Sequence, residues 1–91
     1  MNLDELQGIV ESRRRADPAT SYTAALLAGG VDRIGKKIGE EGAELVIAAK
    51  NANPEEITRE AADLLYHTIV LLSSSGVTIT QVYDELARRH K

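Results

Sequence analysis

The amino-acid sequence predicts an all-α domain, a helical bundle of about four to five helices with a central antiparallel helix hairpin. Apolar residues recur every three or four positions along most of the chain, which is the period of an amphipathic helix. No segment shows the sustained alternation of apolar and polar residues that would indicate strands. The 91 residues include no linker rich in Pro, Gly or Ser, so we expect one domain over residues 1–91.

The first predicted helix begins at Asn2 and ends at Arg15. Asn2 can cap this helix, and Glu5 lies three residues further on, as in a capping box. Asp17-Pro18 then interrupts the helix. Its apolar positions have helical spacing and are Leu3, Leu6, Ile9 and Val10.

A short helical segment is predicted from Ser21 to Ala28, and Gly29-Gly30 ends it. The longest helical stretch follows, from about Asp32 to Lys50, and residues 51–53 form a turn. The apolar stripe of this long helix consists of Ile34, Ile38, Leu45 and Ala49.

The next predicted helix has a strong start signal, with Asn53 as cap, Pro54 at the first helical position and two glutamates in the first turn. It runs to about Ser75, where a glycine follows. Thr78 and Gln81 form a capping box that opens the last helix. The basic residues at the end of the chain suit the negative pole of that helix.

The composition excludes several classes of protein. The net charge is −3 and the 11 Lys and Arg are mostly scattered, so we expect no nucleic-acid surface. The apolar run from Leu64 to Leu72 is far shorter than the roughly 20 residues of a membrane span, and the acidic N-terminus is unlike a secretory signal. With no cysteine, the chain has no disulfide framework and no thiolate metal site. We therefore expect a cytoplasmic protein without a membrane partner.

The core must be built from Leu, Ile, Val and Ala, because the chain has three Tyr and no Phe or Trp. A small aliphatic core of this kind often gains further burial by oligomerisation. We therefore expect a homodimer.

Two segments with the same acidic pattern lie on the two helices of the predicted hairpin. Residues 41–46 and residues 60–65 both read acidic, small, small, acidic, apolar, apolar. At about 100° per residue, acids three positions apart lie about 60° apart beside the apolar stripe. Packing the two stripes together brings both pairs to the same border of the interface. The four converging carboxylates are Glu41, Glu44, Glu60 and Asp63.

Four converging carboxylates repel one another unless a cation neutralises them, and an all-oxygen site suits Mg²⁺. Such a site leaves positions for water and phosphate oxygens, which favours hydrolysis of a phosphoanhydride. Glu40 lies beside Glu41 and is either a further ligand or the base for the attacking water. A single acidic pair is usually the solvated face of a helix, but two pairs in phase favour a metal site.

Other polar residues near these acids each have two interpretations. Phosphates are one possible partner for Arg33, Lys36 and Lys37. The other interpretation is that the lysines form surface salt bridges four residues along the helix, Lys36 with Glu40 and Lys37 with Glu41. His67 either contacts substrate or is a structural hydrogen-bond partner. Three hydroxyl side chains are either a cap with a core tyrosine or contacts to phosphate and ribose, namely Ser21, Tyr22 and Thr23.

Four blocks of the sequence resemble the successive signature blocks of the phosphoribosyl-ATP pyrophosphatase family. The resemblance extends from about Leu3 to Leu86, and the wider EExxE and ExxD pattern is similar to that of the MazG-like all-α nucleotide pyrophosphatases. The blocks are Ser21-Tyr22-Thr23-Ala24, Lys36-Lys37-Ile38-Gly39-Glu40-Glu41, Ala48-Ala49-Lys50-Asn51 and Glu60-Ala61-Ala62-Asp63-Leu64-Leu65-Tyr66-His67.

The resemblance implies hydrolysis of 1-(5-phosphoribosyl)-ATP to 1-(5-phosphoribosyl)-AMP and pyrophosphate, the second step of histidine biosynthesis, by a cytoplasmic homodimer. It implies that the same four acids bind Mg²⁺, with Glu40 beside them. We predict catalytic roles for Glu40, Glu41 and Glu44. The resemblance also assigns the phosphates to Lys36 and Lys37, and substrate contacts to Ser21, Tyr22 and Thr23. We predict further substrate or phosphate contacts from Arg33, Lys50 and His67. The cyclohydrolase domain fused to some members is absent from this sequence, so we expect the stand-alone form.

Two alternatives remain open. A general MazG-type nucleoside triphosphate pyrophosphatase would use the same metal site, although the small number of aromatic rings disfavours base stacking. A non-enzymatic dimerisation module would use the apolar width of residues 64–72, where Ile69 and Val70 fall outside the main stripe. This second alternative leaves the paired acids unexplained.

Overall fold

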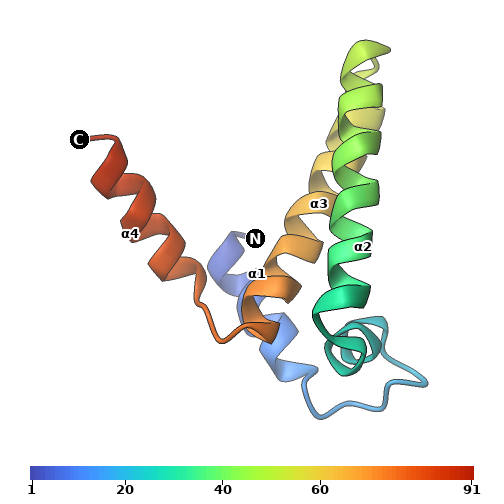
Figure 1. Cartoon of the computed structure of the whole chain (residues 1–91), viewed down its shortest axis with the longest axis vertical. Coiled ribbons are helices and arrows are strands. Elements are labelled where there is room, and N and C mark those ends of the chain that lie inside the picture. Colours follow the sequence, from blue (N-terminus) through green and yellow to red (C-terminus); the bar gives the residue numbers. More distant parts are fainter.

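Four α-helices and no strand make up the computed structural model, which describes residues 1–91 (Figure 1). This arrangement confirms the predicted all-α class. The helices are α1 (Leu3–Ser12), α2 (Tyr22–Lys50), α3 (Pro54–Ser74) and α4 (Ile79–Arg89).

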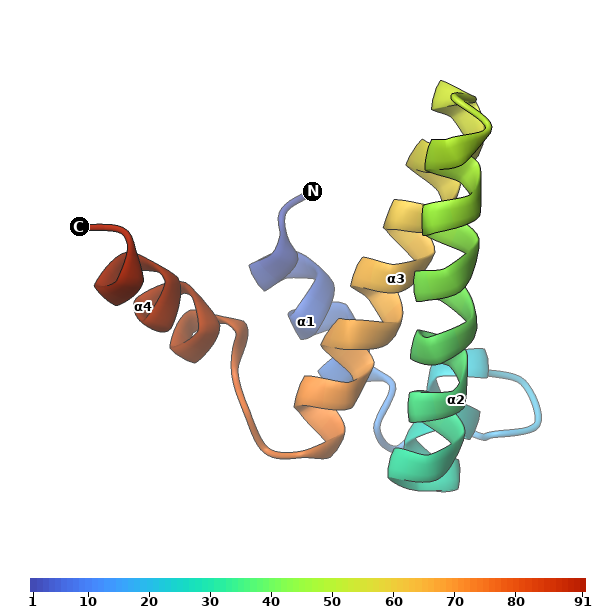
Figure 2. The ribbon, with the colours of Figure 1, turned by 45° about the horizontal axis from the view of Figure 1, so that its top comes forward.

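The helices α2 and α3 form the predicted antiparallel hairpin and lie side by side along most of their length (Figure 2). Its turn is set by Asn53, whose side-chain oxygen accepts hydrogen bonds from the backbone N–H groups of Glu55 and Glu56 at 3.1 and 3.3 Å. Pro54 occupies the first turn of α3, where a missing N–H has no cost. The turn thus fixes which residues of the two helices face each other.

Ala52 in this turn has a φ of 53°, a left-handed conformation that disfavours residues with a Cβ. Replacing Ala52 by glycine is expected to raise the free energy of unfolding by about 0.5 to 1 kcal/mol, because the steric cost exceeds the entropic cost of glycine. Thermal unfolding followed by circular dichroism measures the change. Ala49→Gly, at an exposed helical position, is the matched control and should lower stability by about 1 kcal/mol. Destabilisation by both substitutions would contradict the prediction.

A kink at Gly30 divides α2 into the two helical segments that the sequence predicts. Gly30 has φ 78° and ψ −170°, a combination that is essentially restricted to glycine. Arg33 folds back over Gly29 and donates a hydrogen bond to the Ala25 carbonyl at 3.3 Å. A Cβ on Gly29 would lie 2.5 Å from the Arg33 side chain, so this glycine makes room for the arginine.

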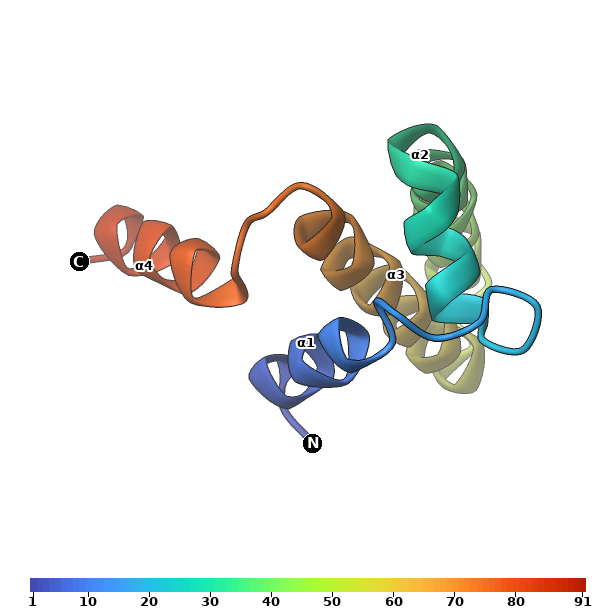
Figure 3. The ribbon, with the colours of Figure 1, turned by 90° about the horizontal axis from the view of Figure 1, so that it is seen from below.

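The helix α3 lies between α1 and α2 (Figure 3). Gln7 joins α1 to the end of α3, the linking segment and the start of α4. Its side chain donates to Ser73 Oγ and the Val77 carbonyl and accepts from the Ile79 N–H at 2.7 Å. The helix α1 ends at Ser12 rather than at Arg15, because the backbone tightens into turns in which the N–H groups of Arg13 and Arg14 bond carbonyls three residues back. The Arg14 side chain also donates to Glu11 and to the Ser73 carbonyl of α3. The helix α4 points away from the hairpin, with its N-terminus fixed by the predicted Thr78 capping box.

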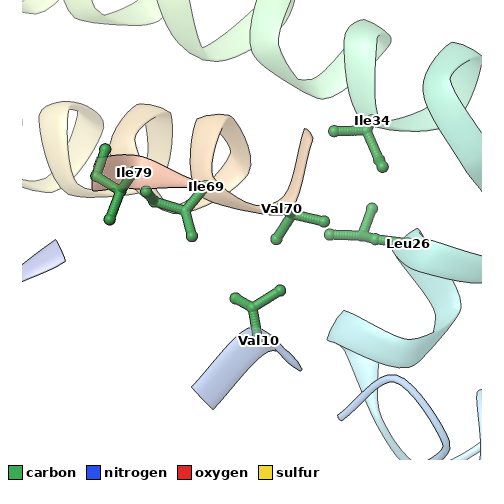
Figure 4. Close-up of a cluster of buried hydrophobic side chains, with 6 residues drawn as sticks. All are labelled: Val10, Leu26, Ile34, Ile69, Val70 and Ile79. Carbon is green, nitrogen blue, oxygen red and sulfur yellow. The ribbon is translucent and has the colours of Figure 1, made fainter. Parts of the chain in front are cut away.

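The core is a cluster of six aliphatic side chains where α1, the start of α2, α3 and the start of α4 meet (Figure 4). It includes Ile69 and Val70, which are buried within the chain. A dimer interface is therefore not needed to bury these two residues, because side chains of α1, α2 and α4 cover them within the chain. The cluster consists of Val10, Leu26, Ile34, Ile69, Val70 and Ile79.

At the far end of the hairpin the structure corrects the expected burial of Ala49, and also that of Leu65, which the helical spacing of Ile57, Ala61 and Leu64 places on the apolar stripe of the second helix. Ala48 rather than Ala49 is buried in α2, and Leu65 of α3 is 48% exposed. Only two helices meet there, so each buries a narrower face than the sequence stripe implies.

No single helix is long and apolar enough to cross a membrane. The helices α3 and α4 together meet the criteria of length and composition, but they are bent by 108° relative to each other.

Candidate metal centre

Three carboxylates from the two helices of the hairpin meet in the structure. One oxygen from each of Glu41, Glu60 and Asp63 can be chosen so that all three lie within 4.8 Å of one another. Glu41 belongs to α2 and the other two belong to α3, so the antiparallel packing brings them together. Glu41 is 6% exposed and belongs to the buried face of α2 rather than to its border, while Glu60 is half-buried and Asp63 is exposed.

Two oxygens of this cluster are buried without a hydrogen-bond partner, Glu41 Oε2 and Glu60 Oε2. The other oxygen of Glu41 lies 3.8 Å from Lys37 Nζ and 3.9 Å from His67 Nδ1, distances too long for strong hydrogen bonds. Buried carboxylate oxygens without partners are energetically costly, and a bound cation removes that cost. The unpartnered oxygens and the all-carboxylate donor set therefore fit a hard divalent ion.

Glu44 lies against Glu60 but outside the group of three. A side-chain hydrogen bond with Glu44, together with burial and the nearby Glu41, raises the pKa of Glu60 to about 7. Such a bond between two carboxyl groups needs a shared proton, so without a cation the cluster retains a proton near neutral pH. The four acids that the sequence singles out thus lie together, with three near enough to share one ion.

Glu40 is exposed on α2 and makes no ion pair. The expected pair between Lys36 and Glu40 does not form, whereas Lys37 does approach Glu41. Both Lys36 and Glu40 therefore remain accessible from solvent. Successive residues of an α-helix lie about 100° apart, so Lys36 and Glu40 point away from the half-buried Lys37 and the buried Glu41 that follow them.

His67 is buried next to the cluster, 4% exposed, and both of its ring nitrogens have partners. Nδ1 lies 2.8 Å from the Asp63 carbonyl, and because a carbonyl can only accept, Nδ1 carries the hydrogen. In the neutral ring Nε2 is then an acceptor, and the Tyr22 hydroxyl donates to it at 2.9 Å. The structure thus gives His67 the role of a hydrogen-bond partner and leaves it no free nitrogen for a ligand.

Two tyrosines pack beside this histidine, a feature that the sequence interpretation missed. The rings of Tyr22 and Tyr66 are stacked with centroids 6.3 Å apart, and Tyr66 meets His67 edge-on at 5.0 Å. Thr23 is hydrogen-bonded to the Tyr66 hydroxyl, and Ser21 caps α2 by accepting from the Ala24 N–H. Tyr66 follows Asp63 by three residues, a spacing that places both on one face of α3 and was the available signal.

The remaining basic residues lie at different distances from the carboxylates. Arg33 is exposed but has one donor engaged with the Ala25 carbonyl. Lys50 lies in the last turn of α2, about 14 Å along the helix from Glu41. Of the predicted phosphate-binding cations, Lys37 is thus the one in contact with the cluster.

Comparison with known proteins gives a consistent set of similarities. A family model described as "Phosphoribosyl-ATP pyrophosphohydrolase" matches residues 3–90. The chain is 51% identical, over 96% of its length and 82% of the relative's, to "Phosphoribosyl-ATP pyrophosphatase" of Rhizorhabdus wittichii. A protein of the same description from Trichlorobacter lovleyi is also 51% identical, over 96% of the chain and 81% of that protein.

Longer relatives match over part of their length. The chain is 45% identical, over 98% of its own residues, to "Histidine biosynthesis bifunctional protein HisIE" of Vibrio cholerae. It spans only 42% of that protein. The similarity to this relative is therefore confined to less than half of the longer protein.

Proposed function

The chain belongs to the phosphoribosyl-ATP pyrophosphohydrolase family, and we propose that it hydrolyses 1-(5-phosphoribosyl)-ATP to 1-(5-phosphoribosyl)-AMP and pyrophosphate, the second step of histidine biosynthesis. The observation that most supports this reaction is the carboxylate cluster with its two unpartnered buried oxygens. A cluster of this kind suits a cation that also binds a polyphosphate. In this reaction water attacks the α–β phosphoanhydride, and pyrophosphate leaves.

The proposed ligands of Mg²⁺ are Glu41, Glu60 and Asp63, with Glu44 completing the set. When bound there, Mg²⁺ supplies positive charge that offsets the phosphate oxygens and polarises the attacked bond. Glu44 is exposed and lies against Glu60, so it is placed to accept the proton of the attacking water. Glu40, one residue before Glu41 and accessible from solvent, is the second candidate for this base.

Lysines at the start of the second segment of α2 are proposed to bind the phosphates. Lys37 is half-buried beside Glu41, and Lys36 is exposed and unpaired. Arg33 retains free donors on its guanidinium while one bonds the Ala25 carbonyl. Positive charge one turn before the carboxylates orients a polyphosphate along α2.

A cytoplasmic homodimer is also part of the proposal. The far end of the hairpin exposes three large aliphatic side chains, Val46 and Ile47 at 57% and Leu65 at 48%. A second copy covering this end would bury them and give the hairpin the helix neighbours that it lacks within one chain. We propose no nucleic-acid or membrane partner.

The test is pyrophosphate release from phosphoribosyl-ATP, measured with Mg²⁺ and again after chelation with EDTA. We expect turnover of phosphoribosyl-ATP with Mg²⁺ and a loss of at least about a hundredfold without it. A panel of ordinary and modified nucleoside triphosphates is the matched comparison. Faster turnover of the panel would favour a general nucleotide pyrophosphatase, and no turnover of any substrate by folded protein would overturn the assignment.

A further inference from the structure

Tyr22 has an unusual environment for a residue at the start of a helix. Its hydroxyl hydrogen is engaged, since it donates to the Nε2 atom of the buried His67 at 2.9 Å, which leaves the hydroxyl no donor for a ligand. Its ring stacks on Tyr66, with an interplanar angle of 25°, yet half of the residue remains exposed. Tyr22 therefore has no hydrogen-bond donor to offer a ligand, and the surface of its ring is what it offers to a flat group.

The ring of Tyr22 lies close to the carboxylate cluster. Only the imidazole of His67 separates its hydroxyl from Glu41, because the opposite nitrogen of that imidazole is 3.9 Å from Glu41 Oε1. An exposed, rigidly held aromatic ring next to a phosphate-binding centre suits a flat heteroaromatic group attached to the phosphates. A nucleotide base has that shape and that connection.

We propose that Tyr22 is the stacking surface for the adenine base of the substrate, and that His67 is a positioning residue which acts through Tyr22. This inference rests on the proposed function. It assigns no contact between His67 and the ligand, since both ring nitrogens of His67 are engaged within the chain. The Tyr22 ring instead meets the face of the base while the carboxylates and lysines hold the phosphates.

The positions of the two bonds to His67 allow a matched pair of variants. In His67→Gln, the amide oxygen can replace Nε2 as the acceptor for the Tyr22 hydroxyl. In His67→Asn, the shorter amide can replace Nδ1 as the donor to the Asp63 carbonyl but cannot reach Tyr22. The first variant therefore keeps the hold on Tyr22 and the second loses it.

Two probes separate recognition of the base from recognition of phosphates: AMP, which carries adenine, and inorganic pyrophosphate, which does not. Isothermal titration of each probe with Mg²⁺ reports binding without any turnover. We expect Tyr22→Leu to weaken AMP binding about tenfold and to leave pyrophosphate binding within about twofold. His67→Asn should also weaken AMP binding, whereas His67→Gln should bind AMP as the wild type does. Because His67 acts through Tyr22, the double variant Tyr22→Leu with His67→Asn should bind AMP no more weakly than Tyr22→Leu alone.

Equal weakening of both probes would overturn the inference, because the residues would then support the phosphate site or the fold in general. Unchanged AMP binding in Tyr22→Leu would also overturn it. The KM for phosphoribosyl-ATP should rise in parallel with the loss of AMP affinity, while kcat changes less. The proposed function is tested separately, by turnover of phosphoribosyl-ATP by the wild type. If the wild type shows no turnover but the variants give the expected AMP affinities, the proposed reaction is rejected and the base-binding role of Tyr22 is retained.

Discussion

Replacing Glu41 by glutamine is expected to lower Mg²⁺-dependent pyrophosphate release by at least about a hundredfold. Glutamine keeps the shape of the side chain but removes the charge of the most buried member of the carboxylate cluster. The helical content of the variant, followed by circular dichroism, should match that of the wild type. Initial rates measured at saturating Mg²⁺ give the size of the effect.

The same substitution is expected to raise the melting temperature of the metal-free protein. Glu41 has one buried oxygen without a partner and lies next to two other acids, so its charge opposes folding when no cation is bound. For a domain of this size, each kcal/mol gained raises the melting temperature by about 4 to 8 °C. Asp84→Asn, an exposed change on α4, is the control and should alter neither quantity. A Glu41→Gln variant that is both active and unchanged in stability would reject the metal centre.

Lowering the pH from about 7.5 to about 5.5 is expected to weaken Mg²⁺ binding about thirtyfold. The pKa of Glu60 is about 7, raised by the hydrogen bond with Glu44, so below that pH a proton must leave before the ion can bind. Each pH unit below the pKa then weakens binding about tenfold. Isothermal titration at several pH values, in buffers of different ionisation enthalpy, measures both the affinity and the released proton.

The same pKa fixes the sign of the pH dependence of stability. Because the folded-state pKa of Glu60 lies above the ordinary value of 4.5, the folded protein binds more protons than the unfolded chain between these two pH values. The metal-free protein should therefore lose stability as the pH rises from about 4.5 to about 7, with no further loss from this group at higher pH. Glu44→Gln removes the largest cause of the shift and should flatten both pH profiles; unaltered profiles in this variant would contradict the assignment.

Local signals account for the part of the fold that was predicted correctly. Caps at Asn2, Asn53 and Thr78 act within one helical turn, so the sequence alone identifies where α1, α3 and α4 begin. The glycine pair after residue 28 likewise located the kink, because a backbone with the dihedral angles of Gly30 excludes other residues. Burial was harder to predict, since it depends on which helices lie alongside. Ile69 and Val70 are covered by side chains of α1, the first segment of α2 and the start of α4, and local periodicity does not predict where these elements lie.

The candidate site was predicted in part for the same reason. In-phase acidic pairs on the two helices of a hairpin bring Glu41, Glu60 and Asp63 together whenever the helices pack along their stripes. The bond between Tyr22 and His67 depends instead on how the kink directs the first turns of α2 toward α3. Contacts of this kind join residues 45 positions apart and leave no periodic pattern in the sequence.

The short turn between α2 and α3 has a consequence for how the protein folds. Glu41 and Glu60 are near neighbours along the chain, so their approach closes a small loop and needs no contribution from either terminus. The helices α1 and α4 complete the core from distant parts of the sequence, so we expect them to join after the hairpin has paired. We therefore expect that partial opening at the two ends of the chain leaves the carboxylates assembled, an expectation that hydrogen exchange can test. The proposed metal ligands would then belong to the most local folding unit of the molecule.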